Sequence, residues 1–135
     1  MTEGELLLRI ASTLKDDIAP AVEAEYPKTQ AFMAAVVLQK LGRQLALAPG
    51  HAQASDADLD ALIADLSVTA TSAPDGVRRS IEALAHARDA AALSQLVQSL
   101  YANRAGLGER RFDELLARVR VALRADIERR LEYAE

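Results

Sequence analysis

An all-α fold is predicted by the composition and periodicity of this sequence, in the form of a single-domain helical bundle of five or six helices over residues 1–135. Half of the residues are apolar, yet only 4% are aromatic and the chain contains no Trp. The core must therefore consist of Leu, Ala, Val and Ile, and Ala and Leu are among the strongest helix formers. Apolar residues recur at spacings of three and four, and no sustained alternation indicates a strand.

A first helix is predicted to begin after Thr2. Thr2 and Glu5 have the spacing of a capping box, in which each side chain binds the backbone amide of the other residue. The apolar stripe that follows has spacings of three and four residues and consists of Leu7, Ile10, Leu14 and Ile18. Pro20 has no amide hydrogen, so the helix is expected to kink or end there.

A second, Ala-rich helix is predicted from Pro27, since proline suits the first turn of a helix. The run Ala31–Leu38 is apolar throughout, and apolar residues continue to Leu45. A helix that is apolar nearly all round requires cover on several sides. We therefore predict this helix at the centre of the bundle. The segment Ala48–His51 contains Pro and Gly and is expected to end it, followed by an exposed loop to residue 54.

The remaining boundaries are marked by caps and glycines. Ser55 is expected to cap a third helix, and a turn over Thr71–Gly76 to end it. Residues 77–105 could form one helix or two, because Ala87–Ala92 contains no breaker. Gly106–Gly108 is a clear break. We predict that the long amphipathic helix beyond it packs along the central helix through Phe112, Leu116, Val119, Leu123, Ile127 and Leu131.

Two groups of possible metal ligands do not complete a site. Asp56, Asp58 and Asp60 have the alternate spacing of a calcium loop, but the Gly and Glu that such a loop needs further on are missing. Glu82 and His86 lie one helical turn apart, without the Glu-x-x-His motif of a metal-binding bundle. No nucleophile or phosphate-binding motif occurs. We assign no catalytic residue, metal or cofactor, and the balance of these observations favours a protein that is not an enzyme.

Composition indicates a protein of the bacterial cytoplasm. The longest apolar run is far shorter than the roughly 20 residues of a membrane span, and the first residues are acidic where a signal peptide would be basic. The absence of Cys excludes disulfides and thiolate metal sites. The formal net charge of −4 argues against nucleic acid or an anionic membrane as a partner.

Four short segments occur along the chain in a recognisable order. They are Leu-Leu in the first helix, Ile-Ala-Pro-Ala at Ile18–Ala21, Gly-Arg-Gln-Leu at Gly42–Leu45, and Leu-Leu-Ala-Arg-Val-Arg at Leu115–Arg120. With these features the chain resembles a bacterial family of small all-helical proteins of unknown function, encoded near aminoglycoside-phosphotransferase-like kinases and acyl-CoA dehydrogenases. It differs at Phe32 and Val36, where the family carries polar residues. The resemblance implies a partner enzyme of kinase or acyl-CoA dehydrogenase type, and no catalytic residues.

Two functions of different classes follow as hypotheses. The first is a non-catalytic accessory or interaction protein that binds a partner, or itself as a homodimer, through a helix face. The alternative is a small-ligand-binding protein or an enzyme with a pocket between helices, a place where bundles hold ligands. Such a pocket would be lined by Ala and Leu, with polar groups from Tyr26, His86 or Tyr101.

Overall fold

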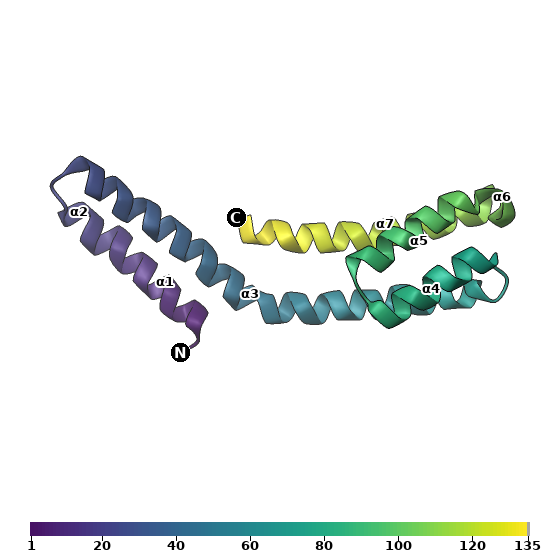
Figure 1. The fold of residues 1–135 in the computed structure, drawn as a ribbon. Coiled ribbons are helices and arrows are strands. Elements are labelled where there is room, and N and C mark those ends of the chain that lie inside the picture. Colours follow the sequence, from purple (N-terminus) through teal and green to yellow (C-terminus); the bar gives the residue numbers. More distant parts are fainter. Residues whose placement is uncertain (135) are drawn as a thin grey trace. The chain divides into compact units, whose positions relative to one another are not determined.

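A computed structural model describes residues 1–134, which are helical over most of their length and contain no strand (Figure 1). The predicted all-α fold is confirmed. None of the helices in this described part of the chain is both long enough and apolar enough to cross a membrane. In chain order the elements are α1 (Glu3–Thr13), the π-helical turn η1 (Leu14–Ile18), α2 (Ala19–Ala21), α3 (Glu25–Ala70), α4 (Asp75–Ala87), α5 (Ala90–Ala102), α6 (Arg104–Leu107), α7 (Glu109–Leu131) and the 3₁₀ turn η2 (Glu132–Ala134).

The chain forms two compact units. The first, here the hairpin unit, consists of residues 1–53 together with the C-terminal residues from 129 onward. The second, here the core unit, consists of residues 54–128. The long helix α3 contributes its first half to the hairpin unit and its second half to the core unit.

The first helix begins and ends as its sequence predicts. Glu5 N donates to Thr2 Oγ1 at 3.2 Å and Thr2 N donates to Glu5 Oε2 at 2.8 Å, which is the predicted capping box. Pro20 cannot donate a backbone hydrogen bond to the carbonyl four residues before it. The chain widens into η1 just before this proline, and the helix stops at Ala21, one residue after it.

The helix that follows does not end where the sequence predicts. The segment Ala48–His51 lies inside α3, and the expected loop to residue 54 and the expected cap at Ser55 are therefore wrong. Proline removes one hydrogen bond from a helix, but its backbone angle remains compatible with one. A single Pro and Gly in a helix of 46 residues lower its stability locally without ending it. The boundary between the two units falls shortly after this weak point, at residue 53.

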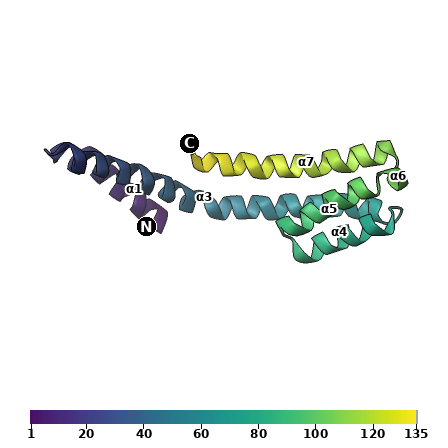
Figure 2. The same cartoon turned by 45° about the horizontal axis from the view of Figure 1, so that its top comes forward.

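The core unit is built around one cluster of buried apolar side chains. The second half of α3 and the helices α4, α5 and α7 lie side by side in both ribbon views (Figure 2). Each contributes one apolar stripe to the cluster, which α6 closes at one end. Its members are Leu62, Leu66, Val77, Ile81, Leu84, Ala92, Leu96, Leu100, Leu107, Phe112, Leu115, Leu116 and Val119.

Residues 77–105 form two helices with a short break between them. Arg88 adopts a left-handed conformation with φ of 52°, which ends α4. Asp89 then caps α5, because its side chain accepts a hydrogen bond from Ala92 N at 2.8 Å. Asx residues commonly cap helices in this way. Of the predicted break at Gly106–Gly108 only Gly108 is non-helical, since Gly106 lies in α6; Gly108 has φ of 84°, a conformation that suits glycine.

Only the first half of α7 packs as its sequence predicts. Phe112, Leu116 and Val119 are buried, whereas Leu123, Ile127 and Leu131 are 38%, 57% and 58% exposed. The reason is one of length: α7 has 23 residues, while α4 and α5 have 13 each. At 1.5 Å per residue the shorter helices span roughly 20 Å against roughly 35 Å for α7. The expected inward face of α7 is therefore wrong beyond Val119.

A bidentate ion pair joins α6 to the start of α7. Arg104 Nε and Nη2 donate to the two carboxylate oxygens of Glu109 at 2.8 and 2.7 Å. This hydrogen bonding holds the pKa of Glu109 below its ordinary value of 4.5 and raises the pKa of Arg104. The guanidinium also lies 4.5 Å from the centre of the Phe112 ring, a cation–π arrangement.

We expect Glu109→Gln to lower the melting temperature slightly at neutral pH and to have no effect in acid. A carboxyl whose pKa is lowered by folding stabilises the protein above its unfolded pKa, and this stabilisation is lost as the pH falls through the folded pKa. The ion pair is exposed to solvent, so the expected change in melting temperature is small. Thermal melts of both proteins between about pH 3 and pH 7 measure it. A difference in melting temperature that does not shrink below pH 4.5 would contradict the assignment.

Candidate functional site

The two helices of the hairpin unit meet along small residues. Gly4 and Ala11 on α1 and Ala35 and Gly42 on α3 are buried, and we call these four positions the small-residue seam. A Cβ atom built on Gly4 would lie 2.9 Å from the carbonyl oxygen of Gly42, and one built on Gly42 would lie 3.0 Å from that of Gly4. The two backbones therefore approach so closely that the large apolar side chains cannot lie between them.

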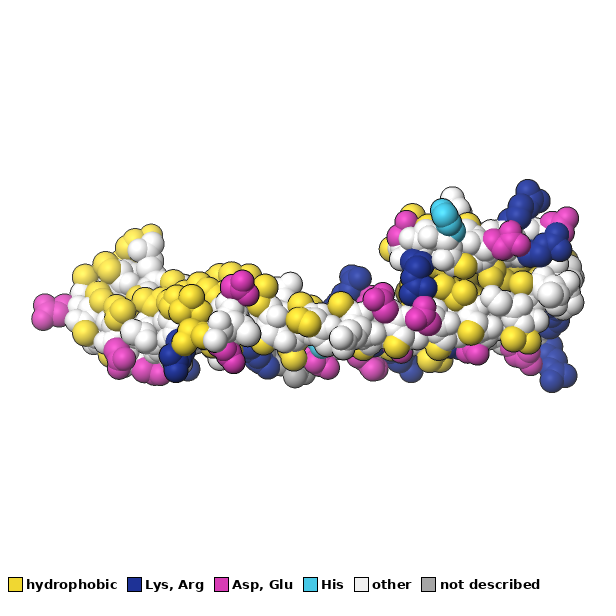
Figure 3. Space-filling model, turned by 90° about the horizontal axis from the view of Figure 1, so that it is seen from below, with side chains coloured by type: hydrophobic (Ala, Val, Ile, Leu, Met, Phe, Trp, Pro, Cys, Tyr) yellow, Lys and Arg dark blue, Asp and Glu magenta, His cyan; other side chains and the backbone are white. Residues whose placement is uncertain are grey.

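Large apolar side chains lie instead beside the seam and remain exposed. Ile10 is 41% and Val37 is 54% exposed, and most of the others fall in or near this range. Leu7, Leu14 and Leu38 are half-buried at the edge of the seam. We define the apolar face of the hairpin unit by Leu6, Leu7, Ile10, Leu14, Ile18, Val37, Leu38, Leu41 and Leu45. Figure 3 shows hydrophobic side chains gathered over the hairpin, at the left of the view.

The two helices contribute to this face by the same sequence pattern. Each seam residue is followed three positions later by a Leu, as Gly4 is by Leu7 and Ala35 is by Leu38. In each helix the first seam residue is followed six positions later by another large apolar residue, Ile10 or Leu41. Equal offsets mean equal rotations about the helix axis. Because α1 and α3 are antiparallel, equal rotations away from the seam bring the apolar residues of both helices to the same side of the hairpin.

The opposite flank of α3 is apolar but interrupted by charge. Phe32 and Val36 are 38% and 45% exposed there, and Lys40 and Arg43 lie within one or two turns of them. Lys40 and Arg43 follow Val36 by four and seven residues, so both cations lie on the same face of α3 as Val36. The nine residues of the apolar face carry no charge, and on this flank the acid Asp17 lies only at the far end of α1, six positions after the seam residue Ala11. The apolar face is therefore the flank that water solvates least well.

An open groove runs along the α1 side of the apolar face. It has a volume of about 280 Å³ and is lined by Arg9, Ile10, Thr13, Leu14 and Ile18. Three of these residues belong to the apolar face, and the groove is bordered by a single cation, Arg9. A large apolar side chain from another helix would fit such a groove, because ridges of one helix pack into grooves of its neighbour.

A polar cluster in the hairpin unit ties the C-terminal turn to α3. His51 Nε2 lies 3.0 Å from a carboxylate oxygen of Glu132, and its Nδ1 lies 2.8 Å from the Tyr133 hydroxyl oxygen. A carboxylate only accepts hydrogen bonds, so Nε2 donates to Glu132, while the Tyr133 hydroxyl can either donate to Nδ1 or accept from it. His51 lies in α3 and not in the loop that the sequence predicts. These contacts join residues more than 80 positions apart and hold the turn η2 against α3.

The core unit contains a groove whose cations are already paired. Its volume is about 420 Å³, and Arg111 and Arg118 are among the residues that line it. Arg118 Nε donates to Asp65 at 2.6 Å. Arg111 donates to the carbonyl oxygens of Thr69 and Ser72, at the end of α3. Cations commonly cap helix C-termini in this manner, and both guanidinium groups are thus engaged within the chain.

Two of the acidic residues considered as metal ligands, Asp56 and Asp60, contact a cation. Arg88 lies 2.8 Å from a carboxylate oxygen of Asp60 and 4.0 Å from one of Asp56. Within residues 1–134 no group of three or more His, Cys, Asp or Glu side chains is arranged to hold a metal ion. The acids of this stretch therefore act with Arg88 to join α3 to the end of α4.

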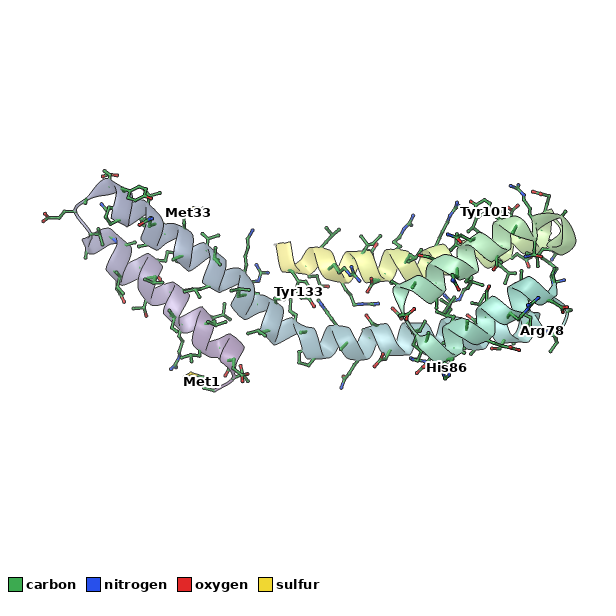
Figure 4. The ribbon with its side chains drawn as sticks, in the orientation of Figure 1. Met1, Met33, Arg78, His86, Tyr101 and Tyr133 are labelled. Carbon is green, nitrogen blue, oxygen red and sulfur yellow. The ribbon has the colours of Figure 1, made fainter. Side chains whose placement is uncertain are left out.

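The three residues predicted for a polar pocket belong to three different helices and are all exposed. Tyr26, on α3 in the hairpin unit, is 73% exposed, and its hydroxyl accepts a hydrogen bond from Gln30 Nε2 at 3.1 Å. His86, on α4, and Tyr101, on α5, belong to the core unit (Figure 4). Tyr101 packs edge-on against the Phe112 ring at a centroid distance of 5.1 Å. None of the three lines the groove beside α1 or the groove of the core unit described above.

Reasoning from the sequence missed the seam, although a signal for it exists. Gly4 and Ala11 are seven residues apart, and so are Ala35 and Gly42. A repeat of seven places small residues on one helix face through two turns.

No family model matches the chain, and no curated protein or solved structure matches it either.

Proposed function

We propose that this chain is a non-catalytic interaction protein that binds a protein partner through the apolar face of its hairpin unit. The observation that carries the proposal is the uncharged strip of large side chains that the seam leaves uncovered, with Val37 at 54% and Leu6 at 49% exposed. Soluble monomers rarely expose contiguous apolar patches larger than a few hundred Å². Larger patches of this kind mark interaction sites.

The size of the apolar face supports this role. If each of its side chains leaves on the order of 70 Å² exposed, the face presents roughly 600 Å² of apolar surface. At about 25 cal/mol per Å², covering it would contribute on the order of 15 kcal/mol before the entropic cost of association. The first part of α3 carries apolar side chains on several sides, but within the hairpin only α1 covers it, on one side. A partner that covered a second side would stabilise this helix.

The chemistry of the face also selects the class of partner. It offers methyl and methylene groups and no charged group, so it suits the apolar stripe of another helix better than a nucleic acid or a polar metabolite. Such a role is compatible with the bacterial cytoplasm predicted from composition. A kinase-like or acyl-CoA-dehydrogenase-like enzyme remains one partner that the family resemblance suggests.

Native affinity purification of the tagged chain from its host, in which the untagged chain is also produced, tests the proposal with two matched variants. This arrangement recovers a different protein and a second copy of the chain alike. Val37→Glu puts a charge in the apolar face, and Val121→Glu makes the same change on α7 at a position 62% exposed and outside the face. We expect a stoichiometric partner, identified by mass spectrometry, with the wild type and with Val121→Glu. We expect Val37→Glu to lose it, because a charge buried in an interface must be desolvated.

Equal recovery of the partner by Val37→Glu and Val121→Glu would overturn the proposal. Both valines are more than half exposed, so neither change should prevent folding. Circular dichroism of each purified variant checks that the helix content is retained.

A further inference from the structure

We infer that the partner of the apolar face is a second copy of this chain, and that two hairpin units join into an antiparallel four-helix bundle. The inference rests on the proposed function and adds the identity of the partner. Two helices joined by a short turn, with one shared apolar side, form half of such a bundle. The other half is then supplied by an identical hairpin.

The internal symmetry of the face favours self-association. A two-fold interface brings the same patch of both copies together, so the patch must be complementary to itself. Ile10 on α1 and Leu41 on α3 occupy equivalent places relative to the seam, as do Leu7 and Leu38. A local two-fold axis perpendicular to the hairpin therefore relates its two stripes. Two such faces present matching rows of side chains to each other.

The charge distribution removes the usual obstacle to self-association. In a two-fold contact, a charge near the axis faces its own copy and is repelled by it. The nine residues of the apolar face carry no charge, and the acids on the same flank, Glu3 and Asp17, lie near the two ends of α1. The nearby cations Arg9 and Lys40 lie on the outer sides of their helices. They also occupy equivalent positions, five residues after Gly4 and after Ala35. The centre of the contact would thus be free of like-charge repulsion.

The area available is what a specific dimer needs. Two apolar faces of roughly 600 Å² each would together bury about 1,200 Å², at the lower bound for stable protein interfaces. Side chains at the edges, such as Ala34, would add to this value. A dimer of moderate affinity, which dissociates on dilution, is therefore the expected state.

Sedimentation equilibrium of the untagged full chain over a wide concentration range tests the inference. We expect the wild type to approach twice the chain mass of 14.5 kDa at high concentration. Ile10→Glu and Leu41→Glu should each raise the dimer dissociation constant by about 100-fold or more, because each places two charges in the interface. The local symmetry predicts similar effects for both. Val121→Glu, outside the face, should leave the constant unchanged.

A dimer that survives both face substitutions would overturn the inference, and so would a wild type that stays monomeric at every concentration. In the monomeric case, hydroxyl-radical footprinting of the same sample separates the two proposals. Rapid modification of Ile10 and Leu41 would leave the face free for a different protein, so the proposed function would stand without self-association. Protection of both side chains in the monomer would mean that the chain covers its own face, and both proposals would fail.

Discussion

Leu96→Ala is expected to destabilise the core unit by about 2–5 kcal/mol, the usual cost of such a truncation at a site that cannot collapse. Leu96 is 0% exposed and belongs to the cluster to which α3, α4, α5, α6 and α7 all contribute. Removing three carbons there loses their transfer free energy and leaves a cavity. Urea unfolding followed by circular dichroism measures the free energy, and hydrogen exchange of the α5 amides reports the same loss locally.

Leu123→Ala is the matched control for this change. It removes the same atoms from α7 at a position 38% exposed, where solvent can fill the space. We expect a loss below about 1 kcal/mol. Equal losses for Leu96→Ala and Leu123→Ala would mean that the core extends along α7 further than the structure indicates.

Where apolar periodicity and a local cap agree, the helices could be predicted from the sequence. The capping box of Thr2 and Glu5 marks the start of α1, and Gly106–Gly108 marks the break before α7. Both signals act within one turn of the chain. The stripe of Phe112, Leu116 and Val119 likewise identifies the buried part of α7.

The errors arise where a local signal is weak compared with the helix around it. Pro49 costs a helix one hydrogen bond, and a long helix on both sides outweighs that cost, so α3 continues. At Asp89 the sequence predicts no boundary, yet one occurs. Arg88 adopts a left-handed conformation that ends α4, and the Asp89 side chain then caps α5. Neither result follows from residue preference alone.

The candidate site was only half predictable. The apolar run over Ala31–Leu38 indicates a helix that needs cover, and one residue of this run, Ala35, belongs to the seam. The predicted central position implies cover on several sides, whereas within the hairpin unit α1 covers one side and leaves Val37 and Leu41 exposed. Which side stays open depends on how α1 and α3 face each other, and that depends on backbone contact at two glycines.

The close approach at those glycines leads to a second large effect: Gly4→Ala should destabilise the hairpin unit by about 1–3 kcal/mol, although alanine normally favours a helix. The added Cβ would lie 2.9 Å from the Gly42 carbonyl oxygen and 3.2 Å from the Ala46 nitrogen. These are backbone atoms, which cannot rotate away as a side chain can. The helices must separate instead, and the packing along the small-residue seam is weakened.

Gly50→Ala, in the same long helix as Gly42, is the control that isolates this contact. A Cβ on Gly50 would meet nothing within 4 Å, so the substitution should stabilise α3 by about 0.5–1 kcal/mol through reduced backbone entropy in the unfolded chain. Hydrogen exchange of the amides in α1 and in the first half of α3, together with thermal melts, compares the two variants.

Stabilisation by both would show that α1 and α3 are further apart than the seam requires. The apolar face would then lose its geometric basis, because side chains such as Leu7 and Leu38 could turn inward between separated helices. Opposite signs for the two glycines would instead establish that backbone contact at the seam is what keeps these side chains at the surface.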